Sequence, residues 1–222
     1  LKPGEIEKIS EEITRKFEVT DIPDDLKDMI EQSYIELGKR LGIENPRVAV
    51  RSSATLEDVA EASFAGIQDT YLNVQGIEDL LKYVKMVWAS IWTARALIYR
   101  ESLGLDHRKV SIAVIVQKMV NSKSSGVMFT VHPATGETNK IVIESSWGLG
   151  ELIVGGIVTP DSFVLDKNTL NIIERRISAK KIGRFYDPVN KKNVDIELLD
   201  NPEDYPEGPL YDLLKMFGIT SK

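Results

Sequence analysis

Two amphipathic helices are predicted near the start of the chain. Apolar residues recur at helical spacing over residues 5–17, at Ile6, Ile9, Ile13 and Phe17. A second helix opens at Pro23-Asp24, where Asp24 is a suitable N-cap, and Gly42 provides its stop. The apolar face of this second helix comprises Leu26, Met29, Ile30, Leu37 and Leu41.

One long helix is predicted from about Ile77 to Ser102. Glu78 and Asp79 suit the positive N-terminal end of a helix, and Gly104 suits its C-terminal end. Arg95 lies on the apolar stripe of this helix, where an apolar residue would be expected. The rest of the stripe is Ile77, Leu80, Leu81, Val84, Trp88, Ile91, Trp92 and Ile98.

Strand patterns dominate the second half of the chain. Before the long helix, Val48–Arg51 reads as a short strand and residues 52–70 as a loop that tightens at Ala65-Gly66. After it, β-branched runs separated by Gly, Asn and Pro favour a mostly antiparallel sheet. These runs are Val110–Val120, Gly126–Val131, Lys140–Ser145, Ser162–Asp166 and Asn171–Ser178. Helices first and strands later predict an α+β fold.

Two later segments are less regular. Residues 147–158 are compatible with either a helix or a strand. Asn201–Pro209 contains three prolines and indicates a linker or loop, and Leu210–Phe217 indicates a short final helix.

Composition narrows the class of protein. The 222 residues are 42% hydrophobic and 28% charged, which is typical of a soluble globular chain. The net charge of −6 gives no long-range attraction to nucleic acid or to an anionic membrane, so an anionic ligand must be held by a local cluster of donors. Absence of cysteine excludes disulfides, thiolate metal sites and thiol catalysis. No apolar run of 18 residues is present, and we expect a cytoplasmic protein.

Several familiar motifs are excluded. The chain has no Walker-type phosphate loop, and Gly148 to Gly155 matches a dinucleotide fingerprint only loosely, with the wrong spacing. His107 and His132 lie far apart in the sequence and lack the carboxylate pattern of a metal site. We therefore assign no metal ligand and expect both histidines at the surface or in turns.

Arg51 is the most specific candidate for ligand binding. A strand that ends in arginine and continues as Ser52-Ser53-Ala54 lets a guanidinium and backbone N–H groups converge on one anion. A second small-residue loop, 63–70, could fold back on it, because Gly66 permits close backbone approach to a phosphate. The alternative is that Arg51 caps the strand and pairs with Glu57 or Asp58. On spacing alone this plainer interpretation is favoured by about two to one.

Six blocks read in order change that balance. The first, at residues 48–74, reads V-A-V-R-S-S-A-T-L-E-D-V-A-E-A-S-F-A-G-I-Q-D-T-Y-L-N-V. The others are W-A-S-I-W-T-A-R-A-L-I-Y-R (88–100), V-Q-K-M-V (116–120), S-G-V-M-F-T (125–130), W-G-L-G-E-L-I-V-G-G-I-V-T-P-D-S-F (147–163) and R-R-I-S-A-K-K-I (175–182). Together they resemble the nucleotide-binding region of the phosphoenolpyruvate synthase and pyruvate phosphate dikinase family, over roughly residues 47–185. The sequence motifs A-S-F-A-G and W-G-L-G-E resemble those of the synthases most.

The resemblance implies an ATP-grasp-like fold, with mixed or antiparallel sheets and flanking helices in two lobes that close on ATP and Mg²⁺. Members of the family pass the β-phosphoryl group of ATP through a histidine on a separate domain to pyruvate, which gives phosphoenolpyruvate, AMP and phosphate. Arg51 matches an arginine that contacts the nucleotide phosphates, and its charge would offset charge that migrates during phosphoryl transfer. Gly66, Ile67 and Gln68 match the loop that covers the phosphates. Arg95 resembles a second phosphate-facing arginine; its alternative is a core-edge residue that reaches solvent.

The remaining site residues also come from the resemblance. Gln117, Met119 and Val120 match the segment between the lobes, whose backbone pairs with adenine while Met119 packs on the ring; the alternative is a plain strand end. Ser125 precedes Gly126 in a turn that could touch a phosphate. Glu151 matches a glutamate for the ribose hydroxyls, and the alternative is a carboxylate that only starts a helix.

Other family features have no counterpart in this sequence. The sequence lacks the early lysine that the family has in a Gly-Gly-Lys context. It also lacks the magnesium-binding glutamate and glutamine that the family has further downstream, in D-I-E-W and Q-A-R, and the phosphohistidine motif. Asp195-Ile196-Glu197 is an accidental match in a connecting segment. We therefore expect an ATP-binding fragment, incomplete at both ends, with magnesium ligands outside it. On its own it should bind ATP weakly or not at all and be inactive. The phosphohistidine and pyruvate-binding domains of a longer chain would be its partners.

Three divisions of the chain are predicted: a helical lead-in at 1–46, an ATP-grasp nucleotide-binding core at 47–187, and a linker with a short helix at 188–222. Two other functions stay open from the sequence. One is a non-catalytic ATP-grasp-like module with a binding or regulatory role. The other is part of a different dikinase, a pyruvate phosphate or glucan water dikinase. We expect no nucleic-acid partner and no membrane partner, and the oligomeric state has no signal in the sequence.

Overall fold

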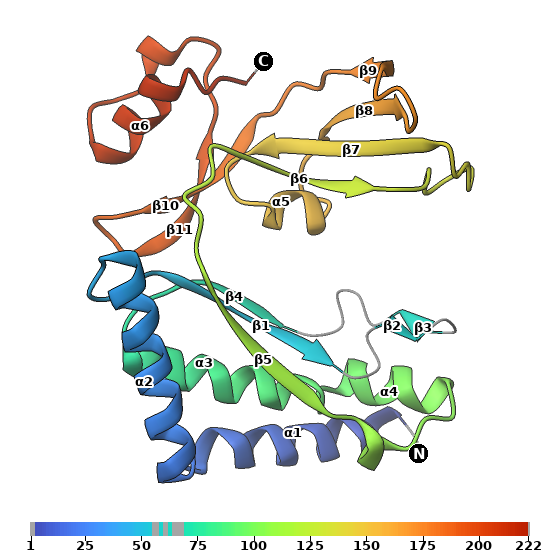
Figure 1. The fold of residues 1–222 in the computed structure, drawn as a ribbon, viewed down its shortest axis with the longest axis vertical. Coiled ribbons are helices and arrows are strands. Elements are labelled where there is room, and N and C mark those ends of the chain that lie inside the picture. Colours follow the sequence, from blue (N-terminus) through green and yellow to red (C-terminus); the bar gives the residue numbers. More distant parts are fainter. Residues whose placement is uncertain (1–2, 55–57, 60–61, 64–68, 222) are drawn as a thin grey trace. The chain divides into compact units, whose positions relative to one another are not determined.

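A computed structural model describes residues 3–54, 58–59, 62–63 and 69–221 (Figure 1). The chain divides into two compact units, Leu1–Met119 and Val120–Lys222. Each unit is taken by itself below. Within the described residues, no helix is both long enough and apolar enough to cross a membrane.

The first unit contains helices on one side of a small antiparallel sheet (Figure 1). Its helices are α1 (Pro3–Val19), α2 (Asp24–Leu41), α3 (Ile77–Ser90), α4 (Ala94–Ser102) and the 3-10 helix η1 (His107–Lys109). Its sheet has the order β4-β1-β5, made of β4 (Thr70–Val74), β1 (Val48–Ala54) and β5 (Ile112–Lys118). The short strands β2 (Asp58–Val59) and β3 (Ala62–Ser63) pair with each other. β1 continues three residues beyond Arg51, so Arg51 lies inside the strand rather than at its end.

One face of this sheet forms the core of the first unit. Val48 and Val50 of β1 are fully buried against Leu80 and Val84 of α3. Tyr34 of α2 closes the end of this core: its hydroxyl donates to the Pro46 carbonyl (2.7 Å) and accepts from the Gly76 N–H (3.0 Å). Burial raises the pKa of the Tyr34 hydroxyl. Because side chains alternate across a strand, the neighbouring Ala49 and Arg51 are directed to the other face.

The prediction of one helix from Ile77 to Ser102 is wrong, because the chain breaks between α3 and α4. The Ser90 hydroxyl donates to the Val87 carbonyl (2.7 Å), and the Thr93 hydroxyl donates to the Ser90 carbonyl (3.0 Å). Thr93 then caps α4 by accepting from the Ala96 N–H (3.4 Å). Hydroxyl side chains that bond nearby backbone groups compete with the continuous helical ladder. As a result Arg95 lies in the exposed first turn of a new helix.

The second unit is built from two antiparallel sheets. One has the order β6-β7-β8-β9, with β6 (Ser124–Phe129), β7 (Lys140–Trp147), β8 (Asp161–Asp166) and β9 (Ile172–Arg176). The other is the hairpin of β10 (Ile182–Asp187) and β11 (Lys192–Glu197), which the sequence pattern did not indicate. The helices of the second unit are α5 (Glu151–Val154), the 3-10 helix η2 (Pro202–Asp204) and α6 (Pro209–Phe217). The ambiguous segment 147–158 therefore contains a strand end and one short helix.

A separate core belongs to the second unit. Phe185 of β10 and Ile196 of β11 are buried with Leu214 of α6, and Leu198, Tyr205 and Ile219 complete the cluster. The predicted α+β class, with antiparallel sheets and flanking helices, is confirmed. The predicted divisions at residues 46 and 187 stay predictions.

Candidate functional site

Arg51 and Gln117 share the open face of the β4-β1-β5 sheet. Arg51 lies opposite Ile115 of β5, and Gln117 lies opposite Ala49 of β1. Residues directly opposite one another in an antiparallel pair point to the same side of the sheet. Both side chains are exposed, and the side chains of Glu57 and Asp58, the partners that the plainer interpretation gives to Arg51, lie outside the described ones. A cation and an amide thus lie two residues apart along the ladder, on the face opposite to the core that contains Val48 and Val50.

The edge of β5 carries unpaired backbone groups. The Met119 N–H donates to the Arg47 carbonyl (2.9 Å), which makes residues 47 and 119 a hydrogen-bonded pair. Such pairs alternate along an antiparallel ladder, so residues 117 and 115 also bond to β1, whereas Val116 and Lys118 direct their N–H and C=O away from it. In the described sheet β5 is an edge strand. The backbone groups available to a ligand are therefore those of Val116 and Lys118, whereas the N–H of Met119 is already used.

Sequence reasoning missed the backbone of Lys118. The alternation of ladder hydrogen bonds could have indicated it, but only once the pairing register with β1 was known. Val120, which follows, has an exposed side chain, and its carbonyl accepts from the Ser122 N–H (3.0 Å).

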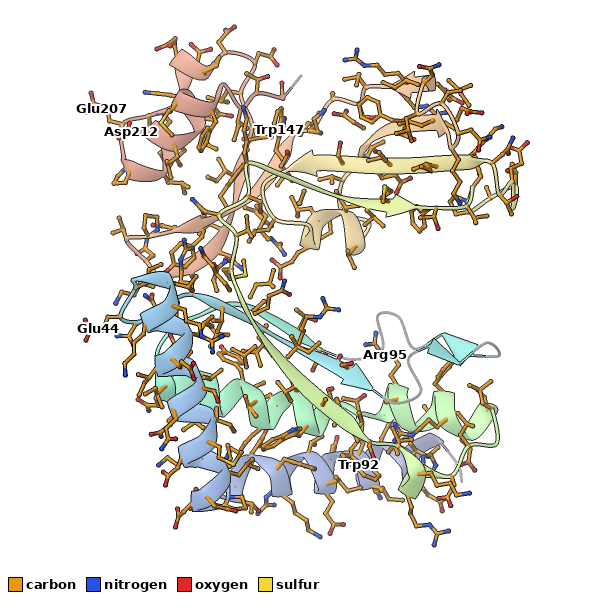
Figure 2. The ribbon with its side chains drawn as sticks, in the orientation of Figure 1. Glu44, Trp92, Arg95, Trp147, Glu207 and Asp212 are labelled. Carbon is orange, nitrogen blue, oxygen red and sulfur yellow. The ribbon has the colours of Figure 1, made fainter. Side chains whose placement is uncertain are left out.

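Arg95 and Trp92 lie on opposite sides of the connection between α3 and α4, with Trp92 on the side of α1 (Figure 2). Trp92 borders a small hollow of about 120 Å³ together with Ile6, Ile9 and Ile13 of α1. Arg95 is exposed, in agreement with a side chain that is not part of the core. The phosphate-covering loop expected at Gly66, Ile67 and Gln68 lies outside the described residues.

Ser125 joins β6 to the Gly148–Glu151 loop. Its hydroxyl donates to the Gly148 carbonyl (2.6 Å). On the other side of the loop, the Leu149 N–H donates to the Arg184 carbonyl of β10 (2.8 Å). Gly148 has a φ of +79°, and a Cβ at this position would lie 2.0 Å from the Arg184 oxygen. The loop is therefore clamped between β6 and β10, and only glycine fits at its tightest point.

Glu151 begins α5 and enters a polar cluster with residues of the β10–β11 hairpin. Its Oε2 lies 3.6 Å from Arg184 Nη1 and 3.5 Å from Asn193 Nδ2. Arg184 also binds Asp195 through two hydrogen bonds, Nε to Oδ1 (2.6 Å) and Nη2 to Oδ2 (2.8 Å). These bonds lower the pKa of the Asp195 carboxyl, and the two carboxylates, Asp195 foremost, raise the pKa of Arg184. Asp195 thus belongs to a built ion-pair cluster.

The Glu151 carboxylate keeps acceptor capacity. Its side chain is 34% exposed, and both contacts use Oε2. No described residue is hydrogen-bonded to Oε1. A carboxylate offers about four lone-pair sites, so Glu151 can accept hydrogen bonds from a ligand while it stays in the cluster.

The structure thus groups the candidate residues in two places. Arg51 and Gln117 lie on one sheet face of the first unit. In the second unit Ser125, which lies in β6 rather than in a turn, bonds to the loop that ends at Glu151. No three His, Asp or Glu side chains gather at metal-binding distance anywhere in the described ranges. His107 and His132 have local partners: His107 Nδ1 accepts from Arg100 Nε (3.1 Å), and His132 Nδ1 accepts from the N–H groups of Ala134 and Thr135 (both 3.3 Å).

A large hollow of about 910 Å³ elsewhere in the first unit contains none of the candidate residues. It lies among α1, α3 and β4, and charged side chains of both signs line it, among them Asp21, Lys82 and Lys85. Lys85 Nζ already donates to the Glu18 and Thr20 carbonyls (2.9 and 3.0 Å). The volume of this hollow alone gives no reason to prefer the hollow to the sheet face that carries Arg51.

A protein-family model matches residues 2–207 of the chain. The matching family is described as "Pyruvate phosphate dikinase, AMP/ATP-binding domain".

Similar curated proteins are several times longer than this chain. The chain is 58% identical over 203 residues to a phosphoenolpyruvate synthase of Aeropyrum pernix, and this alignment covers 91% of the chain and 25% of that protein. It is 48% identical to a probable phosphoenolpyruvate synthase of Staphylothermus marinus (95% of the chain, 26% of the relative). It is 50% identical to a phosphoenolpyruvate synthase of Pyrococcus furiosus (82% of the chain, 22% of the relative). The chain therefore spans about a quarter of the length of these relatives.

Proposed function

We propose that this chain, which belongs to the pyruvate phosphate dikinase AMP/ATP-binding domain family, forms the ATP-binding part of a phosphoenolpyruvate synthase. The complete reaction would convert ATP, pyruvate and water to phosphoenolpyruvate, AMP and phosphate. The phosphoryl group would travel on a histidine of another domain, and a pyruvate-binding domain would receive it.

One observation carries the proposal: the Arg51 side chain and the unpaired edge of β5 lie on the same small sheet. Adenine presents a donor next to an acceptor, and the adjacent C=O and N–H of a strand edge are complementary to that pair. Arg51 and Gln117 are offset by two residues along the ladder, about 7 Å. This separation allows the base to bind at the edge while Arg51 faces the phosphates.

The charge chemistry agrees with a phosphate role for Arg51. The chain is acidic overall, with a net charge of −6, so a polyphosphate must be attracted by local cations. An exposed guanidinium on a sheet strand can give two parallel N–H bonds to phosphate oxygens. Arg95 would be a second phosphate contact, and Mg²⁺ would bridge the phosphates. A cytoplasmic location fits a chain without cysteine.

Saturation-transfer NMR on the 222-residue chain tests this proposal, because the method detects the weak binding that we expect. ATP and adenosine should both receive saturation at the adenine protons. Arg51→Gln should weaken ATP binding by about 10-fold, which corresponds to one charged hydrogen bond, and leave adenosine binding unchanged.

Arg108→Gln is the matched control, since Arg108 is an exposed arginine of the same unit that pairs with Asp106 (3.0 Å). An equal loss of ATP binding in the control, or an Arg51→Gln variant that binds ATP as tightly as the wild type, would refute the phosphate role of Arg51. Micromolar binding of Mg-ATP in calorimetry would show that the early lysine and the magnesium-binding carboxylate, which have no counterpart in this sequence, are dispensable.

A further inference from the structure

We propose that the first unit binds an extended peptide segment, which adds to β5 as an antiparallel strand and places its apolar side chains in a groove between β5 and α2. The partner is a segment with aliphatic side chains at alternate positions and a carboxylate at each end. The inference does not depend on the proposed function, because the segment pairs with Ile112–Val116 and leaves the backbone of Lys118 to adenine.

The outer edge of β5 is long and regular. β5 pairs with β1 in unbroken register from Ile112 to Lys118, and in the described part of this sheet β1 is its one neighbour. The alternation that directs the backbone groups of Val116 and Lys118 away from β1 does the same for those of Ile112 and Val114. Such a row of outward N–H and C=O groups is a template for a further strand.

An apolar groove lies beside this edge. It is a hollow of about 550 Å³, bounded by Leu26, Met29 and Ile30 of α2 and by Val114 and Val116 of β5. Met29 is 64% exposed and Leu26 36%. Exposed apolar side chains that line one hollow indicate a site that binds another molecule.

The edge and the groove have the same periodicity. Val114 and Val116 direct their backbone groups outward and also line the groove with their side chains. Residues that form a hydrogen-bonded pair in an antiparallel ladder place their side chains on the same face of the sheet. Each residue that bonds to Val114 or Val116 therefore directs its side chain into the groove. An extended strand meets both requirements, whereas a helix or a small apolar molecule meets only that of the groove.

The charges nearby define the ends of the segment. Glu36 and Arg40, the charged side chains that line the groove, pair with each other, so the groove is suited to uncharged side chains. Exposed lysines lie near both ends of the edge, because Lys109 precedes β5 and Lys118 ends it. A carboxylate at each end of the segment complements these cations and favours association.

A synthetic peptide of the same length as β5 tests the proposal, with valine alternating with threonine and a glutamate at each end. It is added to the ¹⁵N-labelled 222-residue chain and followed by NMR. The amide signals of Val114 and Val116 should shift, and their hydrogen exchange should slow. The same peptide with N-methylated valines should not bind, because the valine N–H groups are those that face β5.

Two variants separate the edge from the groove. Val114→Pro removes an outward N–H that makes no bond to β1, so the ladder with β1 remains, and peptide binding should weaken by about 10-fold. Met29→Glu places a charge in the groove and should also weaken peptide binding by about 10-fold, without any change in adenosine binding. Met128→Glu is the matched control: Met128 is 60% exposed and belongs to the second unit, and this variant should bind the peptide as the wild type does.

Three results would overturn the proposal. The first is a wild type that does not bind the peptide. The second is equal binding of the N-methylated peptide, which would mean that the groove captures apolar side chains without strand pairing. The third is self-association of the wild type in sedimentation that Met29→Glu abolishes, which would make a second copy of the chain the occupant.

Discussion

Lys180 shows how one buried cation is accommodated in the second unit. Its side chain is 2% exposed, and its Nζ donates to Asp161 Oδ1 (2.6 Å) and to the Ser178 carbonyl (2.8 Å). The same Asp161 oxygen accepts from the Ser178 N–H (2.9 Å). Asp161 therefore compensates a buried charge and ties the segment after β9 to the start of β8.

Asp161→Ala should destabilise the chain by about 3–5 kcal/mol, because it leaves the Lys180 ammonium buried without its carboxylate. Urea denaturation measures the change. Glu174→Ala removes a carboxylate from the exposed pair with Arg176 and should cost less than about 1 kcal/mol. Similar shifts in both variants would contradict the prediction.

The Arg184–Asp195 pair predicts a dependence of stability on pH. Its hydrogen bonds lower the pKa of Asp195 in the folded state below the unfolded value of about 3.9. The pair therefore stabilises the fold above about pH 4, and this contribution is lost as the pH falls through the lower folded pKa.

Carbon-detected NMR titration of the carboxyl groups tests this directly. Asp195 should titrate below its usual range in the wild type, and Arg184→Gln should raise its pKa toward the ordinary value. The stability gap between the wild type and Asp195→Asn should narrow as the pH falls below about 4. An unchanged Asp195 titration in Arg184→Gln would disprove the pair. This measurement needs no nucleotide, so it checks the geometry of the cluster independently of binding.

At the scale of elements, the Gly148–Glu151 loop depends on close approach of two backbones. Gly148 and Gly156 both have positive φ, +79° and +64°, but only Gly148 has an atom where a Cβ would be placed. Gly156, which follows α5, therefore needs glycine for its φ alone, whereas Gly148, in the loop, needs the space as well.

Gly156→Ala should cost about 1–2 kcal/mol for the left-handed conformation. Gly148→Ala should cost roughly a further 1–3 kcal/mol, because the methyl group collides with the Arg184 carbonyl. Thermal unfolding followed by circular dichroism compares the two variants. Equal losses would mean that the loop can move away from β10 without cost.

The break between α3 and α4 shows which part of an element the pattern could predict. The apolar stripe runs through both helices, so periodicity alone indicated one helix. The decisive residues were Ser90 and Thr93, whose hydroxyls bond to the backbone. The break also determines which arginine is internal. Arg100 is buried to 1% exposure over the Trp92 ring (5.6 Å), and this burial lowers its pKa, whereas Arg95 is exposed.

At the scale of the whole molecule, each unit has a core of its own. Leu80 is fully buried among Val48, Val50 and the residues of α3, and Leu214 is 1% exposed beside Phe185 and Ile196. Each of the two clusters lies entirely within one unit.

Leu80→Ala and Leu214→Ala should each destabilise their own unit by about 2–5 kcal/mol. Hydrogen exchange followed by mass spectrometry resolves the effect along the chain. Amides of the first unit should lose protection in Leu80→Ala while those of the second keep it, and the reverse should hold in Leu214→Ala. Loss of protection throughout the chain in either variant would show that the two cores unfold together.

The sequence by itself determined the α+β class, most strands and the family, because these depend on local periodicity and on ordered motifs. Only the tertiary structure placed Arg51 and Gln117 on one open face, assigned the free edge of β5 to Val116 and Lys118, and joined Glu151 to Arg184 and Asp195. These relations depend on pairing register, and a shift of one residue would turn each side chain to the other face of its sheet. Residues 151 and 184 are 33 positions apart in the sequence, so no local pattern connects them.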